Sequence, residues 1–354
     1  MQDNSFKTYP LLRPLSWLYG LITTARNRRF DNGRLKIESF DLPVISVGNL
    51  SAGGTGKTPM CAYLLQLLAD NSLQPALLSR GYGRKTKGFR CVQPDSLATE
   101  VGDEPLELYR RFSGKTPIFV CENRCEGARR ILSGSNNVDA LILDDAFQHR
   151  YIHRDLNIML TDYHRLYTRD RVLPEGLLRE SRKGAGRADI IIVTKCPADL
   201  SIAQAEEIRR EICPQPGQHL FFAKITYAEP VAAFATGSEQ LLSQNPDSRV
   251  LVFTGIAKAE PLLHYYKERF RQTTALRYPD HHFFSAKELH NIAKAAEEAD
   301  LVVTTAKDLQ RLPHDLPVSL KAKLLVQHIS VELLFKQNPE FDRLVIQTID
   351  SHKQ

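Results

Sequence analysis

Short apolar runs alternate with segments of helical spacing along much of the chain. Between residue 41 and about residue 195 the runs are "LPVISVGN", "PALLSRGYG", "TPIFVCEN", "VDALILDD", "LNIMLTD" and "DIIIVTKC". They are rich in β-branched residues, and helical patterns lie between them. This alternation predicts an α/β fold with a mostly parallel sheet and helices on both of its faces.

The alternation of strand and helix patterns is interrupted near residue 225. "ITYAEPVAAF" has the pattern of an extended linker, and a second α/β unit follows with "RVLVFTGIAKAEPLLHYYKERF" and "ADLVVTTAKDLQRLP". We therefore predict a helix and basic flank over 1–30, a main α/β domain over 31–224, and a linker with a smaller α/β lobe over 225–354. Two lobes with a cleft between them would suit the binding of two substrates.

An apolar stretch near the N-terminus, "YPLLRPLSWLYGLITTA", does not fit the strand pattern. It is interrupted by an arginine and a proline and is shorter than the roughly 20 apolar residues of a bilayer span. A helix from Leu15 to about Ala25, with Trp17 and Tyr19 at headgroup depth, would lie in an anionic membrane surface. Basic residues follow it: Arg26, Arg28, Arg29, Arg34 and Lys36. A helix packed on the protein's own core explains the stretch equally well.

A glycine-rich loop, "NLSAGGTGKTP" at 49–59, joins the first predicted strand to the helical pattern "PMCAYLLQLLAD". Its glycines let backbone N–H groups converge, and the helix N-terminus adds a positive dipole end, so we expect a phosphate cradle rather than a plain turn. Ser51 stands where the strict G-x-x-x-x-G-K-[ST] pattern has a glycine. The expected cradle residues are Ser51, Gly53, Gly54, Thr55, Gly56, Lys57 and Thr58.

Side chains beside this loop predict phosphoryl-transfer chemistry. Lys57 would contact the terminal phosphates, and the Thr58 hydroxyl would bind a Mg²⁺ ion that bridges them. The run "VDALILDD" ends in Asp144 and Asp145, the position at which such proteins usually hold the metal. The alternative is that these carboxylates cap the turn after the strand.

Two other segments offer groups for the acceptor. Asp103 and Glu104 head a helix in "VGDEPLELYRRF", where an N-cap is the simplest interpretation and proton acceptance from an attacking hydroxyl is the functional one. In "RYPDHHFFSAKEL" a capping box opens a helix and leaves His281 on the preceding loop. Four further residues could contact the phosphates or the acceptor, although each could equally be a solvated surface residue: Arg80, Gln148, His149 and Arg179.

The amino-acid composition narrows the possible classes of protein. The 354 residues, 42% hydrophobic and 25% charged, suffice for two α/β domains with ordinary cores. Six scattered cysteines indicate reduced thiols rather than a zinc site. The net charge of +6 is modest, and basic residues are not interleaved with aromatics, so no nucleic acid is expected as a partner.

Seven motifs, in their order and spacing, resemble the tetraacyldisaccharide 4'-kinase family of lipid A biosynthesis: "GNLSAGGTGKTP", "SRGYGR", "GDEP", "DDAFQH", "LLRE", "PDHH" and "TTAKD". The resemblance covers nearly the whole chain. It implies a P-loop NTPase-like kinase that uses ATP and Mg²⁺ to phosphorylate the 4'-hydroxyl of a tetraacyldisaccharide 1-phosphate, giving lipid IVA. It also implies a Gram-negative source, a peripheral or shallowly anchored position on the cytoplasmic face of the inner membrane, and no obligate protein partner.

The resemblance also implies roles for single residues. Asp103 with His281 would be the base dyad, Lys57 would hold phosphate, and Arg179 and His149 would organise the acceptor. The metal would be supported by Thr58, Glu104, Asp144 and Asp145. The chain departs from the family at two positions where glycine and glutamate are usual: Ala146 and Ala306.

A P-loop switch protein that gates a partner is the competing hypothesis. The segment "VTKCP" is similar to the T-K-x-D pattern with which guanine-specific switch proteins read the base, but Pro197 replaces the aspartate. The sequence therefore does not predict GTP specificity.

Overall fold

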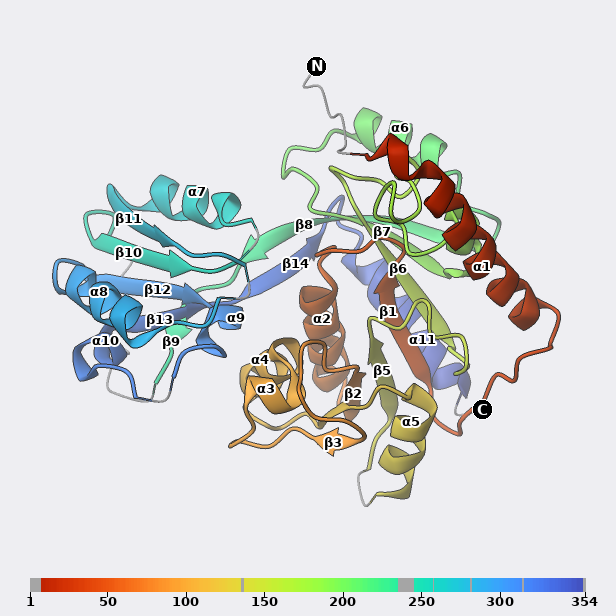
Figure 1. Cartoon of the computed structure of the whole chain (residues 1–354), viewed down its shortest axis with the longest axis horizontal. Coiled ribbons are helices and arrows are strands. Elements are labelled where there is room, and N and C mark those ends of the chain that lie inside the picture. The colour runs from red at the N-terminus through yellow and green to blue at the C-terminus, as the bar shows by residue number, and fades with distance from the viewer. Residues whose placement is uncertain are drawn as a thin grey trace. The chain divides into compact units, whose positions relative to one another are not determined.

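The computed structural model describes residues 8–134, 137–234, 245–256, 258–280, 282–313 and 315–352. The chain forms two compact units, each with its own sheet (Figure 1). The first unit consists of Met1–Pro94, Leu108–Thr226 and Ser330–Gln354, and the second consists of Asp95–Glu107 and Tyr227–Ile329.

A nine-stranded sheet, in the order β14-β8-β7-β6-β1-β5-β2-β4-β3, forms the first unit. The neighbours from β8 to β4 run parallel, whereas β3 runs antiparallel to β4. The six apolar runs of the sequence correspond to β1, β2, β4, β5, β6 and β7, so the predicted parallel sheet is confirmed. The strands are β1 (Val44–Asn49), β2 (Pro75–Ser79), β3 (Arg90–Cys91), β4 (Ile118–Val120), β5 (Ala140–Asp144), β6 (Leu156–Asp162), β7 (Ile190–Thr194), β8 (His219–Tyr227) and β14 (Ile329–Leu333).

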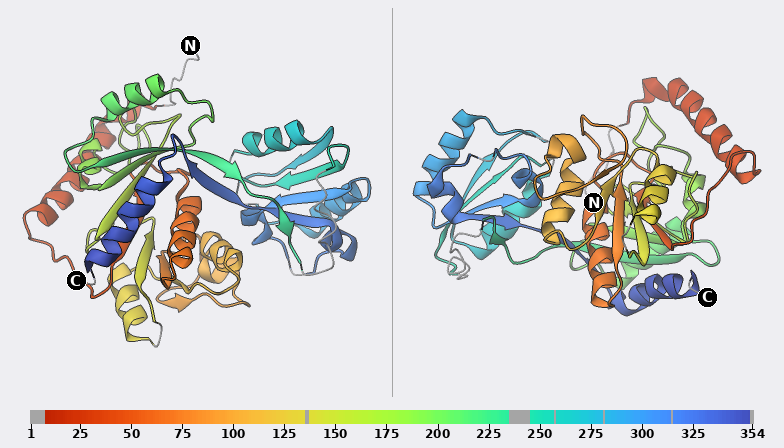
Figure 2. Two further views of the ribbon diagram at one scale, coloured as in Figure 1. Left: turned by 180° about the vertical axis from the view of Figure 1, so that it is seen from behind. Right: turned by 90° about the horizontal axis from the view of Figure 1, so that it is seen from below.

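Helices cover both faces of this sheet (Figure 2). They pack there because its strands are buried and alternate side chains of a strand point to opposite sides. Helices α5 (Arg124–Ser133) and α6 (Ile202–Ile212) contribute to two apolar clusters on one face. Helices α2 (Lys57–Asp70) and α11 (Asn338–His352) cover the other face. They contact each other through Tyr63, whose hydroxyl donates a hydrogen bond of 2.7 Å to a carboxylate of α11.

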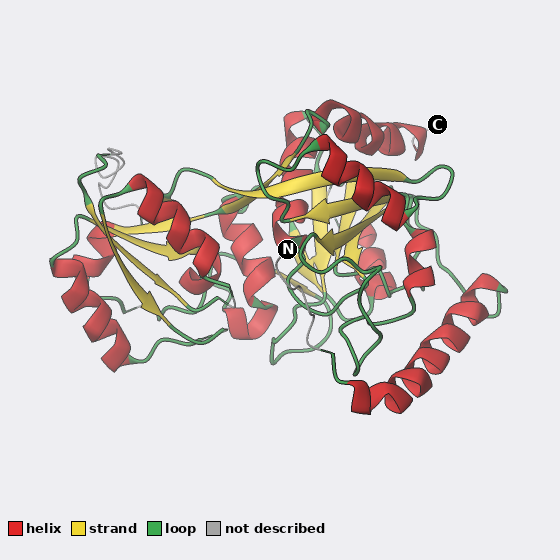
Figure 3. Cartoon of the chain, turned by 90° about the horizontal axis from the view of Figure 1, so that it is seen from above, coloured by secondary structure: helices red, strands yellow, loops and turns green. Residues whose placement is uncertain are grey.

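A five-stranded sheet, in the order β11-β10-β12-β13-β9, forms the second unit. Its strands are drawn in yellow and its helices in red in Figure 3. The sheet is parallel except for β9. Alternate residues of β10 pack against α8 and α10 on one face and against α7 on the other. The elements are β9 (Val231–Ala232), β10 (Arg249–Thr254), β11 (Gln272–Arg277), β12 (Leu301–Thr305), β13 (Leu324–Gln327), α3 (Ala98–Val101), the start of α4 (Asp103–Arg111), α7 (Glu260–Arg269), α8 (Ala286–Glu297), α9 (Ala306–Leu309) and α10 (Val318–Lys323).

The two units are not consecutive segments of the chain. Residues 95–107, which our sequence-based boundaries place in the main domain, belong to the second unit, and Ser330–Gln354 returns to the first. The return occurs because β14 joins β8 in the nine-stranded sheet. The segment interpreted as a linker is extended, but its first residues complete β8 and its later residues form β9.

The N-terminal helix α1 (Arg13–Asp31) has its apolar and polar residues in an unusual arrangement. The face that contacts the protein carries small and polar side chains: Ser16, Gly20, Thr23 and Asn27, followed by Phe30. The opposite side exposes large apolar ones: Leu15, Trp17, Leu18, Tyr19, Leu21 and Ile22. Helix α1 therefore docks through polar contacts, such as the hydrogen bond of 2.8 Å from the Glu175 N–H to the Ser16 hydroxyl. None of the helices within the described residues has both the length and the apolar character needed to cross a membrane.

Candidate active site

The phosphate loop lies between β1 and α2, as the sequence predicts. Gly53 and Gly56 have φ angles of +111° and +87°, a region that disfavours side chains. The first part of the loop is paired with a later segment: the Ala52 N–H donates to the Leu177 carbonyl, and the Arg179 N–H donates to the Leu50 carbonyl, both at 2.7 Å. Ser51 lies in this paired part, opposite Leu178.

The ends of β6 and β7 hold the middle of the phosphate loop in place. The Thr194 hydroxyl donates a hydrogen bond of 2.8 Å to the Thr55 carbonyl. Lys195 Nζ donates to the Gly54 carbonyl and pairs with Asp162 at 2.8 Å. Sequence reasoning treated Thr194 and Lys195 only as an incomplete guanine-reading motif and missed this role. Their place directly after a strand of the central parallel sheet was the available signal.

Opposite charges gather where α2 begins. Lys57 Nζ lies 3.7 Å from Asp145 Oδ1, and Arg179 Nη1 lies 2.8 and 3.0 Å from the two Asp145 oxygens. Burial opposes ionisation of Asp145, but the charges of Lys57 and Arg179 outweigh it and lower the pKa of that carboxyl. The structure therefore brings together three predicted residues from three separate segments.

Asp144 lies at the end of β5 and is 3% exposed. One of its carboxylate oxygens accepts a hydrogen bond of 2.9 Å from the Ser79 hydroxyl. Its backbone carbonyl accepts one of 2.9 Å from Arg124, a buried guanidinium at the start of α5 that sequence reasoning missed. Burial lowers the pKa of Arg124, and the charge of Asp144 opposes that shift.

The donor atoms beside the loop suit Mg²⁺, which prefers oxygen and commonly takes one or two carboxylates together with phosphate oxygens. Thr58 and Asp144 are both buried. Thr58 lies at the start of α2, which follows β1, and Asp144 ends the adjacent parallel strand β5. Within the part of the chain that the structure describes, no three His, Cys, Asp or Glu side chains form a metal-binding group.

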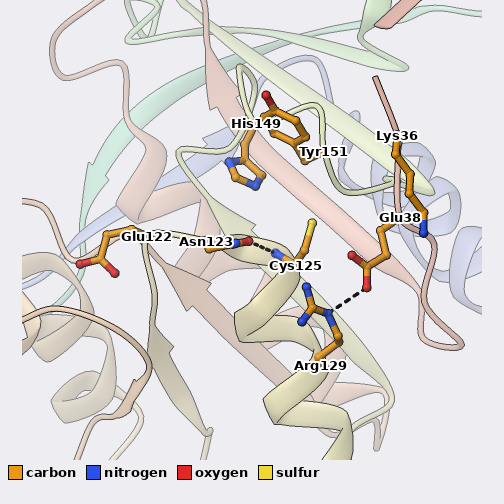
Figure 4. Close-up of a pocket in the computed structure, with 8 residues that line it drawn as sticks. All are labelled: Lys36, Glu38, Glu122, Asn123, Cys125, Arg129, His149 and Tyr151. Atoms are coloured by element: carbon orange, nitrogen blue, oxygen red, sulfur yellow. Dashed lines mark hydrogen bonds and ion pairs between the residues drawn. The ribbon is translucent and has the colours of Figure 1, made fainter. Parts of the chain in front are cut away.

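A pocket of about 500 Å³ opens beside the turn after β5 (Figure 4). His149 points into it, and burial together with Arg124 and Arg26 lowers the pKa of this imidazole to about 4, so the ring is neutral at pH 7. The Nε2 atom of His149 is buried and has no hydrogen-bond partner among the described residues. The pocket is lined by Lys36, Glu38, Glu122, Asn123, Cys125, Arg129, His149 and Tyr151.

The neighbouring Gln148 connects this turn to the loop. Its Nε2 donates hydrogen bonds of 2.9 Å to the Asn49 carbonyl and 3.1 Å to Glu180. Glu180 also accepts a hydrogen bond of 2.5 Å from Asn27 of α1. Arg80, the fourth of the predicted contact residues, is exposed directly after β2.

The other acidic candidates, Asp103 and Glu104, belong to the second unit, where they meet residues of and just beyond α9. Arg311 pairs with Asp103, and Lys307 Nζ lies 2.5 Å from Glu104 Oε1. Burial alone would lower the pKa of Lys307, but Glu104 outweighs it and raises that pKa. We call Asp103, Glu104, Lys307, Asp308 and Arg311 the Asp103 cluster.

His281 lies outside the described residues. The capping box predicted after it is confirmed, since the Ser285 N–H donates a hydrogen bond of 2.8 Å to Glu288 and the Glu288 N–H donates one to the Ser285 hydroxyl. Its neighbour His282 stacks on Tyr278 with ring centroids 5.0 Å apart.

These features define a class of protein: a P-loop α/β protein with an anion cradle at the carboxyl edge of a parallel sheet. The chain belongs to the tetraacyldisaccharide-1-P 4'-kinase family, whose model matches residues 8–350. The family resemblance, the α/β fold and the assignment as a kinase are thereby confirmed.

Similar proteins extend over nearly the whole chain. The tetraacyldisaccharide 4'-kinase of Bacteroides thetaiotaomicron is 40% identical over 361 residues, covering 98% of this chain and 94% of that protein. The Flavobacterium johnsoniae protein of the same name is 43% identical over 302 residues, covering 85% and 87%. A crystal structure of the "apo" form of LpxK from Aquifex aeolicus in complex with ATP matches with a TM-score of 0.72 and 28% identity, over 96% of this chain and 99% of that one. These matches do not favour the switch-protein hypothesis.

Proposed function

We propose that this protein transfers the γ-phosphoryl group of ATP to the 4'-hydroxyl of a tetraacyldisaccharide 1-phosphate, forming lipid IVA in lipid A biosynthesis. The observation that carries the proposal is the cradle at the start of α2, where Lys57 lies beside the Asp145–Arg179 ion pair, in a chain of this kinase family. Relatives bearing that enzyme's name and a relative solved with ATP support the substrates.

On the nucleotide side, the backbone N–H groups from Gly53 to Gly56 would surround the phosphates, and Lys57 would neutralise charge that develops on the transferred group. Mg²⁺ would be held by Thr58 and Asp144, with Asp145 and Glu104 as further candidate ligands. When bound, the ion would neutralise phosphate oxygens and align the leaving group.

On the acceptor side, Asp103 with His281 would receive the proton of the 4'-hydroxyl as that oxygen attacks the γ-phosphorus. The pocket at His149 supports a contribution of that residue to acceptor binding. A neutral imidazole with a buried, unbonded nitrogen can hydrogen-bond a sugar hydroxyl. Gln148 and Arg179, which contact the loop and Asp145, would orient the acceptor toward the phosphates, and Arg80 would meet its anionic group.

We further propose that the protein works peripherally on the cytoplasmic face of the inner membrane of a Gram-negative bacterium. The support is α1, whose exposed side carries Trp17, Leu18 and Ile22. Such side chains gain free energy when they leave water for the acyl boundary. Flotation with vesicles of anionic lipid tests this: Trp17→Glu should weaken binding severalfold, whereas Ile202→Glu, an equally exposed position on α6, should not. Equal weakening by both changes would refute an α1-directed membrane contact.

The reaction is tested by incubating the detergent-solubilised protein with Mg²⁺, γ-labelled ATP and tetraacyldisaccharide 1-phosphate. We expect label in a lipid product whose mass corresponds to lipid IVA. Release of label only as free phosphate would refute the proposed reaction.

A further inference from the structure

The motif "TTAKD" has no role in the proposed chemistry, yet it lies beside Asp103, the proposed base. Thr305 ends β12, and Lys307 and Asp308 belong to α9. Lys307, and Arg311 two residues beyond the end of that helix, contact the acidic pair at the start of α4. All of these residues lie in the second unit.

Asp308 is a fixed anchor. It is fully buried, and one of its carboxylate oxygens accepts hydrogen bonds of 2.7 Å from the hydroxyls of both Thr254 and Thr305. Its other oxygen lies 3.5 Å from Arg311 Nη1. A carboxylate held by two neutral donors and a cation in the interior has little freedom to reorient.

Arg311 extends from this anchor to Asp103. Its side chain is 2% exposed, Nη1 also donates to the Gly255 carbonyl at 3.3 Å, and Nη2 donates to Asp103 Oδ2. The second oxygen of Asp103, Oδ1, accepts a hydrogen bond of 3.0 Å from the Glu104 N–H. Both carboxylate oxygens of Asp103 are thus oriented by groups within the same unit.

We propose that Arg311 is a positioning residue for phosphoryl transfer, which orients the carboxylate of Asp103 while Asp308 and its two threonine donors hold Arg311 in place. The inference rests on the proposed function, in which Asp103 takes the hydroxyl proton as the new O–P bond forms and the bond to the ADP leaving group breaks. Arg311 exchanges no proton in this step. Lys307 orients Glu104 in the same manner.

The test is a double-mutant cycle on label transfer with Arg311→Gln, Asp103→Asn and the combined variant. A misplaced catalytic group can lower a rate by about 100-fold, so we expect Arg311→Gln to reduce kcat by about 10- to 100-fold. The KM for ATP should stay within about twofold, because the phosphate cradle belongs to the first unit. In the Asp103→Asn background the same change should cost less than about twofold, since residues that act as a unit are non-additive.

Two controls separate positioning from folding. Arg249→Gln removes an exposed arginine that pairs with Asp300 in the same unit and should leave kcat unchanged. Arg311→Lys keeps the charge but loses the fork geometry, so it should retain more activity than Arg311→Gln. If Arg311→Gln fails to fold, judged by far-UV circular dichroism, the cycle is run with Arg311→Lys.

Three outcomes would contradict the inference. A folded Arg311→Gln protein with wild-type kcat, or a loss that is fully additive with that of Asp103→Asn, would overturn the positioning role alone. Wild-type kcat in Asp103→Asn would overturn the role of Asp103 and this inference with it. A wild-type protein that forms no labelled lipid would overturn the proposed function itself.

Discussion

The phosphate loop of the first unit and the Asp103 cluster of the second hold charged groups by different means. The loop is one contiguous segment between β1 and α2, fixed by backbone hydrogen bonds, by the neutral Thr194 hydroxyl and by one charged side chain, Lys195. The Asp103 cluster joins residues 208 positions apart in the sequence and is fixed by buried ion pairs. The first arrangement can be predicted from local spacing, whereas the second appears only when the chain has folded.

The largest effect is expected at the loop. Replacing Lys57 with alanine removes the cation beside Asp145 and should lower kcat/KM for lipid phosphorylation by about 100- to 1,000-fold, because electrostatic positioning supplies most of phosphoryl-transfer catalysis. Steady-state label transfer measures the effect, with Lys224→Met, at a salt bridge elsewhere in the first unit, as the matched control. Turnover within a few-fold of wild type would refute the assignment of the loop.

The next effect is on the stability of the second unit. Asp308→Asn leaves Arg311 without its anchor charge, and breaking a buried ion pair costs about 3 kcal/mol or more. Hydrogen exchange of peptides from β10 and β12 should accelerate accordingly. Asp300→Asn, at an exposed pair, should cost less than about 1 kcal/mol. Equal protection from hydrogen exchange in the two variants would show that the ion pairs of the Asp103 cluster contribute nothing to the rigidity of the second unit.

A third prediction concerns pH and the pocket at His149. The pKa of this imidazole is lowered to about 4 in the folded protein. Below about pH 6.5 the imidazole is protonated in the unfolded chain but stays neutral in the folded protein. The free energy of unfolding therefore falls as the pH decreases toward 4. Between pH 7 and pH 5 this loss should amount to about 1 to 2 kcal/mol. Urea unfolding, followed through peptides of the first unit, should show a smaller loss of unfolding free energy between pH 7 and pH 5 for His149→Gln than for the wild-type protein. An identical pH dependence in both proteins would contradict a buried neutral ring.

The smallest effect is expected for the support of the loop. Lys195→Met removes the contacts with the Gly54 carbonyl and Asp162, so the loop loses part of its preorganisation. The KM for ATP should rise about fivefold, while kcat changes less. Wild-type KM would show that β6 and β7 do not position the loop.

The sequence predicted the first unit well because its signals are local. Apolar runs marked β1, β2, β4, β5, β6 and β7. In the second unit, the capping box before α8 marked a helix start in the same way. The division into units was harder, since the pairing of β14 with β8 depends on contacts across the whole chain. The outward side of α1 was also unpredictable, because spacing identifies a helix but not which of its faces docks.

The residues of the candidate site likewise divide into those that motifs predicted and those that the sequence did not reveal. Lys57, Asp145 and Arg179 were named from motifs, and the structure brings them together. The contribution of Lys195 was missed although its place directly after β7 was a signal. The contributions of Arg124 and Arg311 were missed because a single basic residue in a sequence has no signature that distinguishes a buried anchor from a solvated charge.

We propose that the first unit binds the nucleotide while Asp103 of the second unit accepts the proton of the acceptor hydroxyl. The most direct test measures ATP affinity by calorimetry and lipid phosphorylation by label transfer in one variant, Asp103→Asn. We expect wild-type ATP affinity together with transfer slowed by about 100-fold or more, the effect of losing a general base. Weakened ATP binding, or transfer at the wild-type rate, would contradict it.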